Sequence, residues 1–208
     1  MARVSQEHLD ARRRQILDGA ARCFARGGFH ATSMQDVLRE VNLSAGAVYR
    51  YFSGKEALIR AIVEEVLGLI EGAFAAAAEE SPPPPPDVLL GRVMSEVLGK
   101  GGGMEYEGEA GFPRLIIQVW TETLRNDELS AVIREGFDKV RAAWVRIVRA
   151  YQAAGLMRDD VDPESVARTM IAVAQGFAAQ QALFGEAPVE LLQEGLRGLI
   201  SMKEPKAS

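Results

Sequence analysis

Apolar residues recur every three to four positions along nearly the whole chain, which is the period of an amphipathic α-helix. In the first such segment, from about Glu7 to Arg26, the side chains of Ile16, Ala20 and Phe24 share one face. No run alternates apolar and polar residues between turn signals, as a half-buried strand would. The pattern therefore predicts an all-α protein.

Stop and capping residues divide the first part of this pattern into short helices. The pair Gly27-Gly28 is expected to end the first helix, because glycine readily adopts the left-handed conformation found at helix ends. Either Thr32 or Ser33 is expected to cap a short second helix. A tight corner is expected at Asn42, since asparagine tolerates a positive φ.

A third short helix is expected to start after Ser44 and to run through Tyr51, and Gly54 separates it from a long helix that begins near Lys55. Two short helices joined by a three-residue corner, after a longer helix, have the spacing of a helix-turn-helix unit. In such a unit the second short helix enters the major groove of DNA. We therefore expect residues 1–54 to form a DNA-binding domain, a small bundle of three helices.

The third helix has an exposed face suited to reading bases. Val48 and Phe52 are expected to face the core, so Gly46, Ala47 and Arg50 face away from it. An arginine can make a bidentate contact to guanine, and an alanine methyl can meet a thymine methyl. The residues predicted to contact bases or phosphates are Thr32, Ser33, Gln35, Ser44, Ala45, Gly46, Ala47, Tyr49, Arg50, Tyr51 and Lys55.

The charge distribution agrees with this placement. The chain has a net charge of −5, yet residues 1–60 carry 10 Lys and Arg against 6 Asp and Glu. The remaining residues carry 14 against 23, so the basic part is the N-terminal quarter. A basic head on an acidic body suits a protein that presents one end to a polyanion such as double-stranded DNA.

The same region resembles the TetR family of bacterial transcriptional regulators. The resemblance is carried by Ile16-Leu17-x-x-Ala20-Ala21-x-x-Phe24, by Gly27-Gly28-Phe29, and by the segment from Thr32-Ser33-Met34-Gln35-Asp36-Val37 to Leu43-Ser44-Ala45-Gly46-Ala47-Val48-Tyr49-Arg50-Tyr51-Phe52-Ser53-Gly54-Lys55-Glu56-Ala57-Leu58. One departure is Val41-Asn42, where the family commonly has Ala-Gly. The resemblance implies a helical effector-binding and dimerisation domain, here residues 55–208, a homodimer through the last two helices, and repression of transcription until a small molecule binds.

The helices of this larger domain are predicted from the sequence pattern alone. Five consecutive prolines at 82–86 predict a stiff extended connector, after which Asp87 is expected to cap a helix. Pro113 is expected to begin another helix and Asp127 to cap a long one. Two further helices are expected from Pro163 to Phe184 and from Pro188 to Met202.

The last two predicted helices carry apolar stripes that could form a four-helix bundle with a second copy. The alternative, that both stripes face only the core of their own chain, stays open at this point. The stripes consist of Val166, Met170, Val173, Phe177 and Phe184 beside Ala167, Ala174, Ala178 and Ala182, and of Val189, Leu192, Leu196 and Leu199.

Aromatic residues, methionines and glutamines of the body could line an apolar cavity with a few polar anchors, as a small-molecule site requires. The body could instead be an interaction module that answers to a partner protein, since such residues at helical spacing are mostly core. The candidates for binding an effector are Met94, Tyr106, Phe112, Gln118, Trp120, Trp144, Tyr151, Met170, Gln175 and Phe177.

Other function classes find little support. Cys23 is the single cysteine, which rules out an intramolecular disulfide and a cysteine-based zinc site, and it is expected to be a packed thiol. The two histidines, His8 and His30, both lie in the DNA-binding quarter, so neither a catalytic triad nor a histidine metal cluster is expected in the body. We expect no enzyme activity, no cofactor, no metal, no membrane span and a cytoplasmic location.

Overall fold

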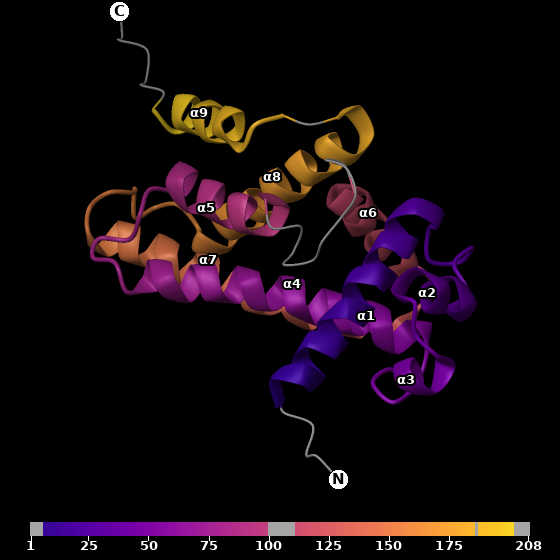
Figure 1. Cartoon of the computed structure of the whole chain (residues 1–208). Coiled ribbons are helices and arrows are strands. Elements are labelled where there is room, and N and C mark those ends of the chain that lie inside the picture. Colours follow the sequence, from indigo (N-terminus) through magenta and orange to yellow (C-terminus); the bar gives the residue numbers. More distant parts are fainter. Residues whose placement is uncertain (1–5, 100–110, 186, 202–208) are drawn as a thin grey trace, which may run out of the picture.

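The computed structural model describes residues 6–99, 111–185 and 187–201, and the regular elements in these ranges are all helices (Figure 1). The predicted all-α fold is therefore confirmed. In chain order the helices are α1 (Gln6–Gly27), α2 (Met34–Val41), α3 (Ala45–Tyr49), α4 (Lys55–Ala78), α5 (Pro86–Gly99), α6 (Gly111–Thr123), α7 (Asp127–Ala153), α8 (Pro163–Phe184) and α9 (Val189–Ile200).

Helices α1, α2 and α3 gather at one end of the long helix α4 (Figure 1). Their shared core contains Phe24, Val37 and Val48, which are all fully buried. Ser33 caps α2, and Asn42 turns the corner toward α3 with a φ of 51°, as the sequence predicts. The helix-turn-helix spacing is therefore present, and α4 connects it to the rest of the chain.

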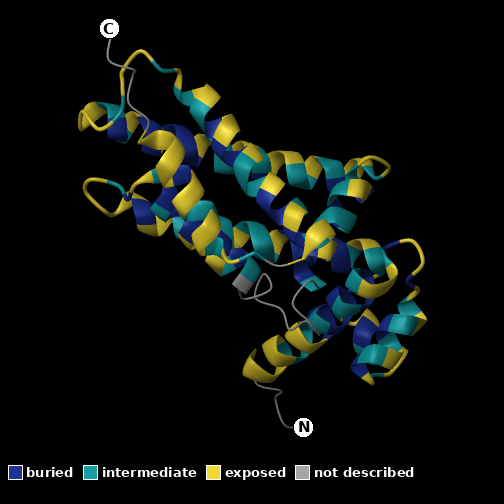
Figure 2. Ribbon diagram, turned by 90° about the horizontal axis from the view of Figure 1, so that it is seen from above, coloured by how far each residue is buried: buried dark blue, intermediate teal, exposed yellow. Residues whose placement is uncertain are grey.

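The remaining helices build the larger body, with their buried residues turned toward its interior and their exposed residues on the outside (Figure 2). Helix α9 lies over α5, far from α4 (Figure 1). Arg197 on α9 forms an ion pair with the buried carboxylate of Asp87 on α5, at 3.0 Å between Nη2 and Oδ2. This pair helps to fix the last helix on the body.

Several helix starts and ends differ from the sequence prediction. Helix α3 ends at Tyr49, because the amide of Tyr51 already bonds to the carbonyl of Val48 in a tightened final turn. Asn126, and not Asp127, caps α7, since its side chain accepts a hydrogen bond from the amide of Leu129. Helix α6 starts two residues before Pro113, at Gly111.

The proline run is packed against the body and is not a free connector. Its last member, Pro86, is already the first residue of α5, so Asp87 lies inside the first turn of that helix and does not cap it. Pro84 is buried, and its carbonyl accepts a hydrogen bond from the hydroxyl of Tyr151 on α7. Burial raises the pKa of Tyr151 above its ordinary value. Residues 82–85 are non-helical, as the sequence predicts for a connector, and only Pro86 departs from that prediction.

Close packing of α1 against α2 depends on a glycine. A Cβ atom added at Gly19 would come within 2.2 Å of Cγ1 of Val41. We therefore expect Gly19→Ala to lower the free energy of unfolding by about 1–3 kcal/mol, the usual effect of overpacking a tight contact. Urea unfolding followed by circular dichroism measures this loss.

The matched control is Gly68→Ala on the exposed side of α4, where an added Cβ would meet nothing within 4 Å. This substitution should raise stability by about 0.5–1 kcal/mol, because alanine is the better helix former. If Gly19→Ala were as stable as Gly68→Ala, the α1–α2 packing described above would be incorrect.

Candidate nucleic-acid interface and effector cavity

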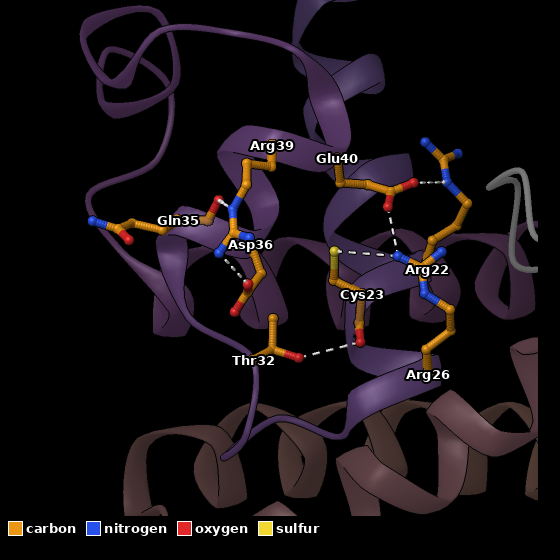
Figure 3. A network of polar contacts seen from close by, with 8 residues as sticks. All are labelled: Arg22, Cys23, Arg26, Thr32, Gln35, Asp36, Arg39 and Glu40. Carbon is orange, nitrogen blue, oxygen red and sulfur yellow. Dashed lines mark hydrogen bonds and ion pairs between the residues drawn. The ribbon is translucent and has the colours of Figure 1, made fainter.

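A network of polar contacts holds α1 and α2 together (Figure 3). Glu40 on α2 pairs with both Arg22 and Arg26 on α1, the first at 2.8 Å. The hydrogen bond from Arg22, followed by that from Arg26, lowers the pKa of Glu40 below its usual range. The carboxylate therefore stays ionised at neutral pH, and the relative position of the two helices is fixed on this side.

Thr32 belongs to this network and not to the DNA-facing surface. Its side chain is buried, and its hydroxyl donates to the carbonyls of Gly28 at 2.8 Å and of Cys23 at 3.2 Å (Figure 3). The prediction that Thr32 contacts a phosphate is wrong for this reason. Cys23 is also buried, as expected, and desolvation raises the pKa of its thiol.

Ser33 and Asp36 form the start of α2. The hydroxyl of Ser33 accepts from the amide of Asp36 at 3.2 Å, while the amide of Ser33 donates to the carboxylate of Asp36 at 2.8 Å. Hydrogen bonds from the Ser33 hydroxyl, and then from its amide, lower the pKa of Asp36. Ser33 and Gln35 remain exposed beside this cap, where a phosphate could approach.

The surface of α3 matches the predicted reading face. Val48 is fully buried, whereas Ser44, Ala45, Gly46 and Arg50 are exposed. Ser44 also caps the helix by accepting a hydrogen bond from the amide of Ala47, which is itself half-buried. Tyr49 is exposed on the same helix, while Tyr51 is half-buried against the core. A short helix with small side chains and one arginine can approach base edges closely.

Arg50 differs from the neighbouring arginines, because its guanidinium has no ion pair or hydrogen bond within the described parts of the chain. Other arginines of this end are engaged in ion pairs. Those pairs are Arg13 and Arg14 with Glu65, Arg22 and Arg26 with Glu40, Arg39 with Asp36, and Arg60 with Glu128. Arg50 is therefore available for an external partner.

Lys55, the first residue of α4, is partly engaged. Its ammonium donates to the carbonyl of Phe29 at 2.8 Å and lies 4.6 Å from the centre of the Phe29 ring. An ammonium group has three protons, so this contact leaves donors for a phosphate. The same contact ties the start of α4 to the loop that follows α1.

The body contains a partly open apolar cavity of about 170 Å³. Residues from five helices, α4 to α8, form its wall. They are Ile62, Val63, Val66, Leu67, Ile70, Phe74, Leu90, Val93, Met94, Val97, Phe112, Leu115, Ile116, Val119, Trp120, Ile133, Phe137, Val140, Trp144, Ile171, Ala174, Gln175 and Ala178. This is a concave, preformed and mostly apolar site of the kind that binds small molecules.

Half of the predicted effector residues lie in this wall, namely Met94, Phe112, Trp120, Trp144 and Gln175. Four others are placed elsewhere, which corrects the prediction. Gln118 faces Gly28, Tyr151 bonds to the proline segment, and Met170 and Phe177 are buried in the core outside the wall. Tyr106 lies outside the described residues.

Sequence reasoning missed the large share of the wall that α4 supplies, including Ile62, Ile70 and Phe74. These residues recur at helical spacing, and spacing alone does not distinguish a packed contact from a cavity wall. Phe74 packs edge-on against Trp144, with ring centroids 5.1 Å apart. The aromatic wall therefore joins α4 to α7.

Helix α6 links the cavity to the DNA-binding end. Trp120 lines the cavity, and two residues further along Glu122 contacts His30, at 2.9 Å between Oε2 and Nε2. Glu122 is buried, although the imidazole of His30 is largely exposed. Gln118 approaches the backbone at Gly28, in the same loop. The loop between α1 and α2 thus rests on α6.

Known sequences and structures resemble the chain over both parts. The family model of "Bacterial regulatory proteins, tetR family" matches residues 16–62, and that of "BetI-type transcriptional repressor, C-terminal" matches residues 109–201. The chain belongs to the TetR family. It is thus a helix-turn-helix transcriptional regulator, as the resemblance in the sequence implied.

Individual relatives of this TetR-family chain agree with the assignment. The HTH-type transcriptional repressor Rv1474c of Mycobacterium tuberculosis is 45% identical over 65 residues, a match that spans only 35% of that protein. The HTH-type transcriptional regulator UidR of Escherichia coli is 24% identical over 94% of both chains. The structure of Salmonella enterica GusR has a TM-score of 0.73 at 25% identity, covering 97% of this chain and all of that one.

Within the described residues, no group of three or more His, Cys, Asp or Glu side chains could hold a metal ion. None of the helices in the described ranges is long and apolar enough to cross a membrane.

The apolar stripes predicted for dimer contact face mainly the TetR-family chain's own core. Ala167, Met170, Phe177, Ala178 and Leu196 are buried, and Ala174 lines the cavity. The alternative left open by the sequence therefore holds for these residues. The exposed face of α8 instead carries Ala172, Gly176, Gln180 and Phe184 at intervals of four, and exposed apolar residues continue at Leu183, Leu191, Leu199 and Ile200.

The unpaired guanidinium of Arg50 leads to a prediction about base reading. Arg50→Ala should weaken binding to the preferred DNA site by about 1–3 kcal/mol and relax the sequence preference, because a base-edge donor is lost. Binding of the purified protein to a selected site and to single-base variants of that site measures both effects.

Arg39→Ala is the matched control, since Arg39 is an exposed arginine of α2 that is already paired with Asp36. Arg39→Ala should weaken DNA binding less than Arg50→Ala does, and by the same factor for all DNA sequences. Equal weakening of every sequence by Arg50→Ala would show that Arg50 contacts the backbone and not the bases.

Proposed function

We propose that the protein is a homodimeric repressor that holds a palindromic operator through α3 and releases it when a small apolar or amphipathic molecule occupies the body cavity. One observation carries this proposal: α4 and α6 both form the cavity wall, and both contact the DNA-binding helices. An occupant of the cavity thus touches the two elements that position α3.

The first connection runs through α4. Its first residue, Lys55, contacts Phe29, and Glu65 in its middle pairs with Arg13 and Arg14 of α1. Wall residues of the same helix extend to Phe74 near its other end. Displacement of the cavity end of this helix would therefore move the DNA-binding end with it.

The second connection runs through α6. Its cavity face carries Trp120, while Gln118 and Glu122 contact the loop at Gly28 and His30. A ligand that shifts Trp120 would shift these contacts in the same movement. Release requires that the ligand fit one position of α6 better than the other, because equal affinity for both forms changes nothing.

Control by a partner protein is the alternative function. The preformed cavity favours the small molecule, since a concave, mostly apolar hollow lined by five helices has the shape that small ligands occupy. Mass spectrometry of the purified protein under native conditions would distinguish the two, because a retained small molecule adds a defined mass.

The proposed dimer uses the exposed face of α8 and α9. Phe184 is 83% exposed at the end of a stripe that includes Ala172 and Gly176, whose small side chains allow close helix contact. We expect Phe184→Asp to shift light scattering from dimer to monomer. The variant should also lose most operator binding, since two recognition helices about 34–36 Å apart read the two half-sites together.

The control for the dimer is Leu156→Asp, at an exposed apolar residue in the turn that follows α7. It should leave both the mass and operator binding unchanged. A wild-type monomer at micromolar concentration, or selected sites without dyad symmetry, would contradict the proposed dimer.

The α6 connection makes a separate prediction about release. The measurement uses a ligand that quenches tryptophan emission and thereby reports its own binding. Operator affinity without this ligand, divided by operator affinity with it, should fall toward one in His30→Ala. A coupling of the usual size corresponds to a ratio of about 5–150 in the wild-type protein. Ligand affinity of the free variant should stay within about twofold, since His30 lies outside the cavity wall.

His8→Ala is the matched control for this measurement, because His8 is an exposed histidine near the start of α1. It should release the operator as the wild-type protein does. Normal release by His30→Ala would mean that α4 alone transmits the signal.

A further inference from the structure

The cavity wall has almost no polar chemistry. Among the described residues that form it, the side chains are aliphatic, aromatic or thioether groups, apart from the amide of Gln175 on α8. Trp120 and Trp144 add only the single N–H donor of each indole. No Asp, Glu, Lys, Arg or His belongs to this set. A ligand inside the cavity would therefore meet apolar surface on nearly all sides.

Gln175 is an unused hydrogen-bonding group. Its side-chain amide forms no hydrogen bond with any residue in the described parts of the chain, whereas Gln181 on the same helix bonds twice to the backbone of Ala187. An amide offers both donor and acceptor atoms. One neutral polar group of a ligand could therefore be satisfied at this single position.

A formal charge on the ligand would find no counter-charge in this wall. An ion that leaves water without a partner loses far more solvation free energy than a neutral polar group that makes a hydrogen bond. Aromatic rings at Phe74, Phe112, Phe137, Trp120 and Trp144 could partly compensate a cation through their π-faces. The negative π-faces repel an anion, for which these residues offer only the neutral N–H donors of the two indoles, so anions are the class that the wall rejects most strongly.

The volume limits the size of the ligand. A cavity of about 150 Å³ in another protein stays dry and binds benzene. The cavity here measures about 170 Å³, which accommodates one six-membered ring with a small substituent. A larger ligand would extend beyond this volume through the open side of the cavity.

We propose that the effector is an uncharged molecule with a single ring or of similar size, carrying one hydroxyl, carbonyl or similar group that hydrogen-bonds to Gln175. This inference rests on the proposed function in that it takes the cavity to be the effector site. It adds that charge and hydrogen bonding at one residue determine which compounds are accepted.

Four ring compounds of similar size test the proposal: toluene, p-cresol, benzoate and benzylammonium. At pH 7 toluene has no ionisable group, and p-cresol is neutral because a phenol has a pKa near 10. Benzoate is an anion at this pH, and benzylammonium is a cation. The chain has only two tryptophans, and both line the cavity, so tryptophan emission reports occupancy directly. Titration calorimetry of the free protein provides an independent affinity.

We expect saturable binding of p-cresol and toluene at about millimolar concentration or below, as their size permits. Benzylammonium should bind at least about tenfold more weakly than p-cresol, and benzoate more weakly still. In Gln175→Leu the affinity ratio of p-cresol to toluene should fall by about fivefold or more, because the hydroxyl loses its partner while the apolar wall remains.

Gln175→Glu tests the same site by adding a charge. It should weaken p-cresol binding and strengthen benzylammonium binding, so that the order of these two ligands reverses. Gln6→Glu is the matched control, because Gln6 is an exposed glutamine at the start of α1. It should bind all four probes as the wild-type protein does.

Operator release is measured with the same probes in a separate assay. Binding of p-cresol through Gln175 without operator release would leave the ligand class intact and contradict the proposed function. Absence of saturable binding by both neutral probes would overturn the inference. Benzoate affinity equal to that of p-cresol, or an unchanged ratio of p-cresol to toluene in Gln175→Leu, would also overturn it.

Discussion

Helix α4 joins the core of the DNA-binding end to the core of the body, which are continuous with each other, and the rest of the structure depends on this constraint. Near its start, Leu58 and Ile59 are buried in the continuous core that includes the DNA-binding helices. Toward its end, Ile70 and Phe74 form the wall of the body cavity. Because an α-helix transmits displacement along its length, neither core can rearrange without affecting the position of the other.

The charged residues of the DNA-binding end serve mainly to hold that end together. Glu40 and Glu65 each bridge two arginines, and these bridges tie α1 to α2 and to α4. Much of the positive charge in the first sixty residues is therefore neutralised within the protein. Within the described residues, Arg50 is an exposed arginine of this end that has no such partner. This arrangement fixes helices α1 to α3 rigidly and leaves a small surface on which sequence specificity can depend.

The sequence predicted the DNA-binding end far better than the cavity. Caps such as Ser33 and the corner at Asn42 are local signals that neighbouring residues determine, and the structure has both. Thr32 looked equally suited to a phosphate, but its burial depends on how α1 packs against the loop. The wall of the cavity depends on five helices together. The sequence therefore identified Trp120 and Trp144 by residue type and placed Tyr151 and Met170 there wrongly.

The two routes from the cavity to α3 differ in physical character. Helix α4 is covalently continuous with the DNA-binding end, so its route is present whatever the ligand does. Helix α6 reaches that end through the contact between Glu122 and His30, in which a buried carboxylate meets an exposed imidazole. A contact of this kind can break at modest cost, because water can replace the histidine. Loss of that contact would loosen the loop before α2 on the side of α6, while Lys55 still holds the loop at Phe29 and the α1–α2 core stays intact. A ligand could thus reposition helices α1 to α3 without unfolding them.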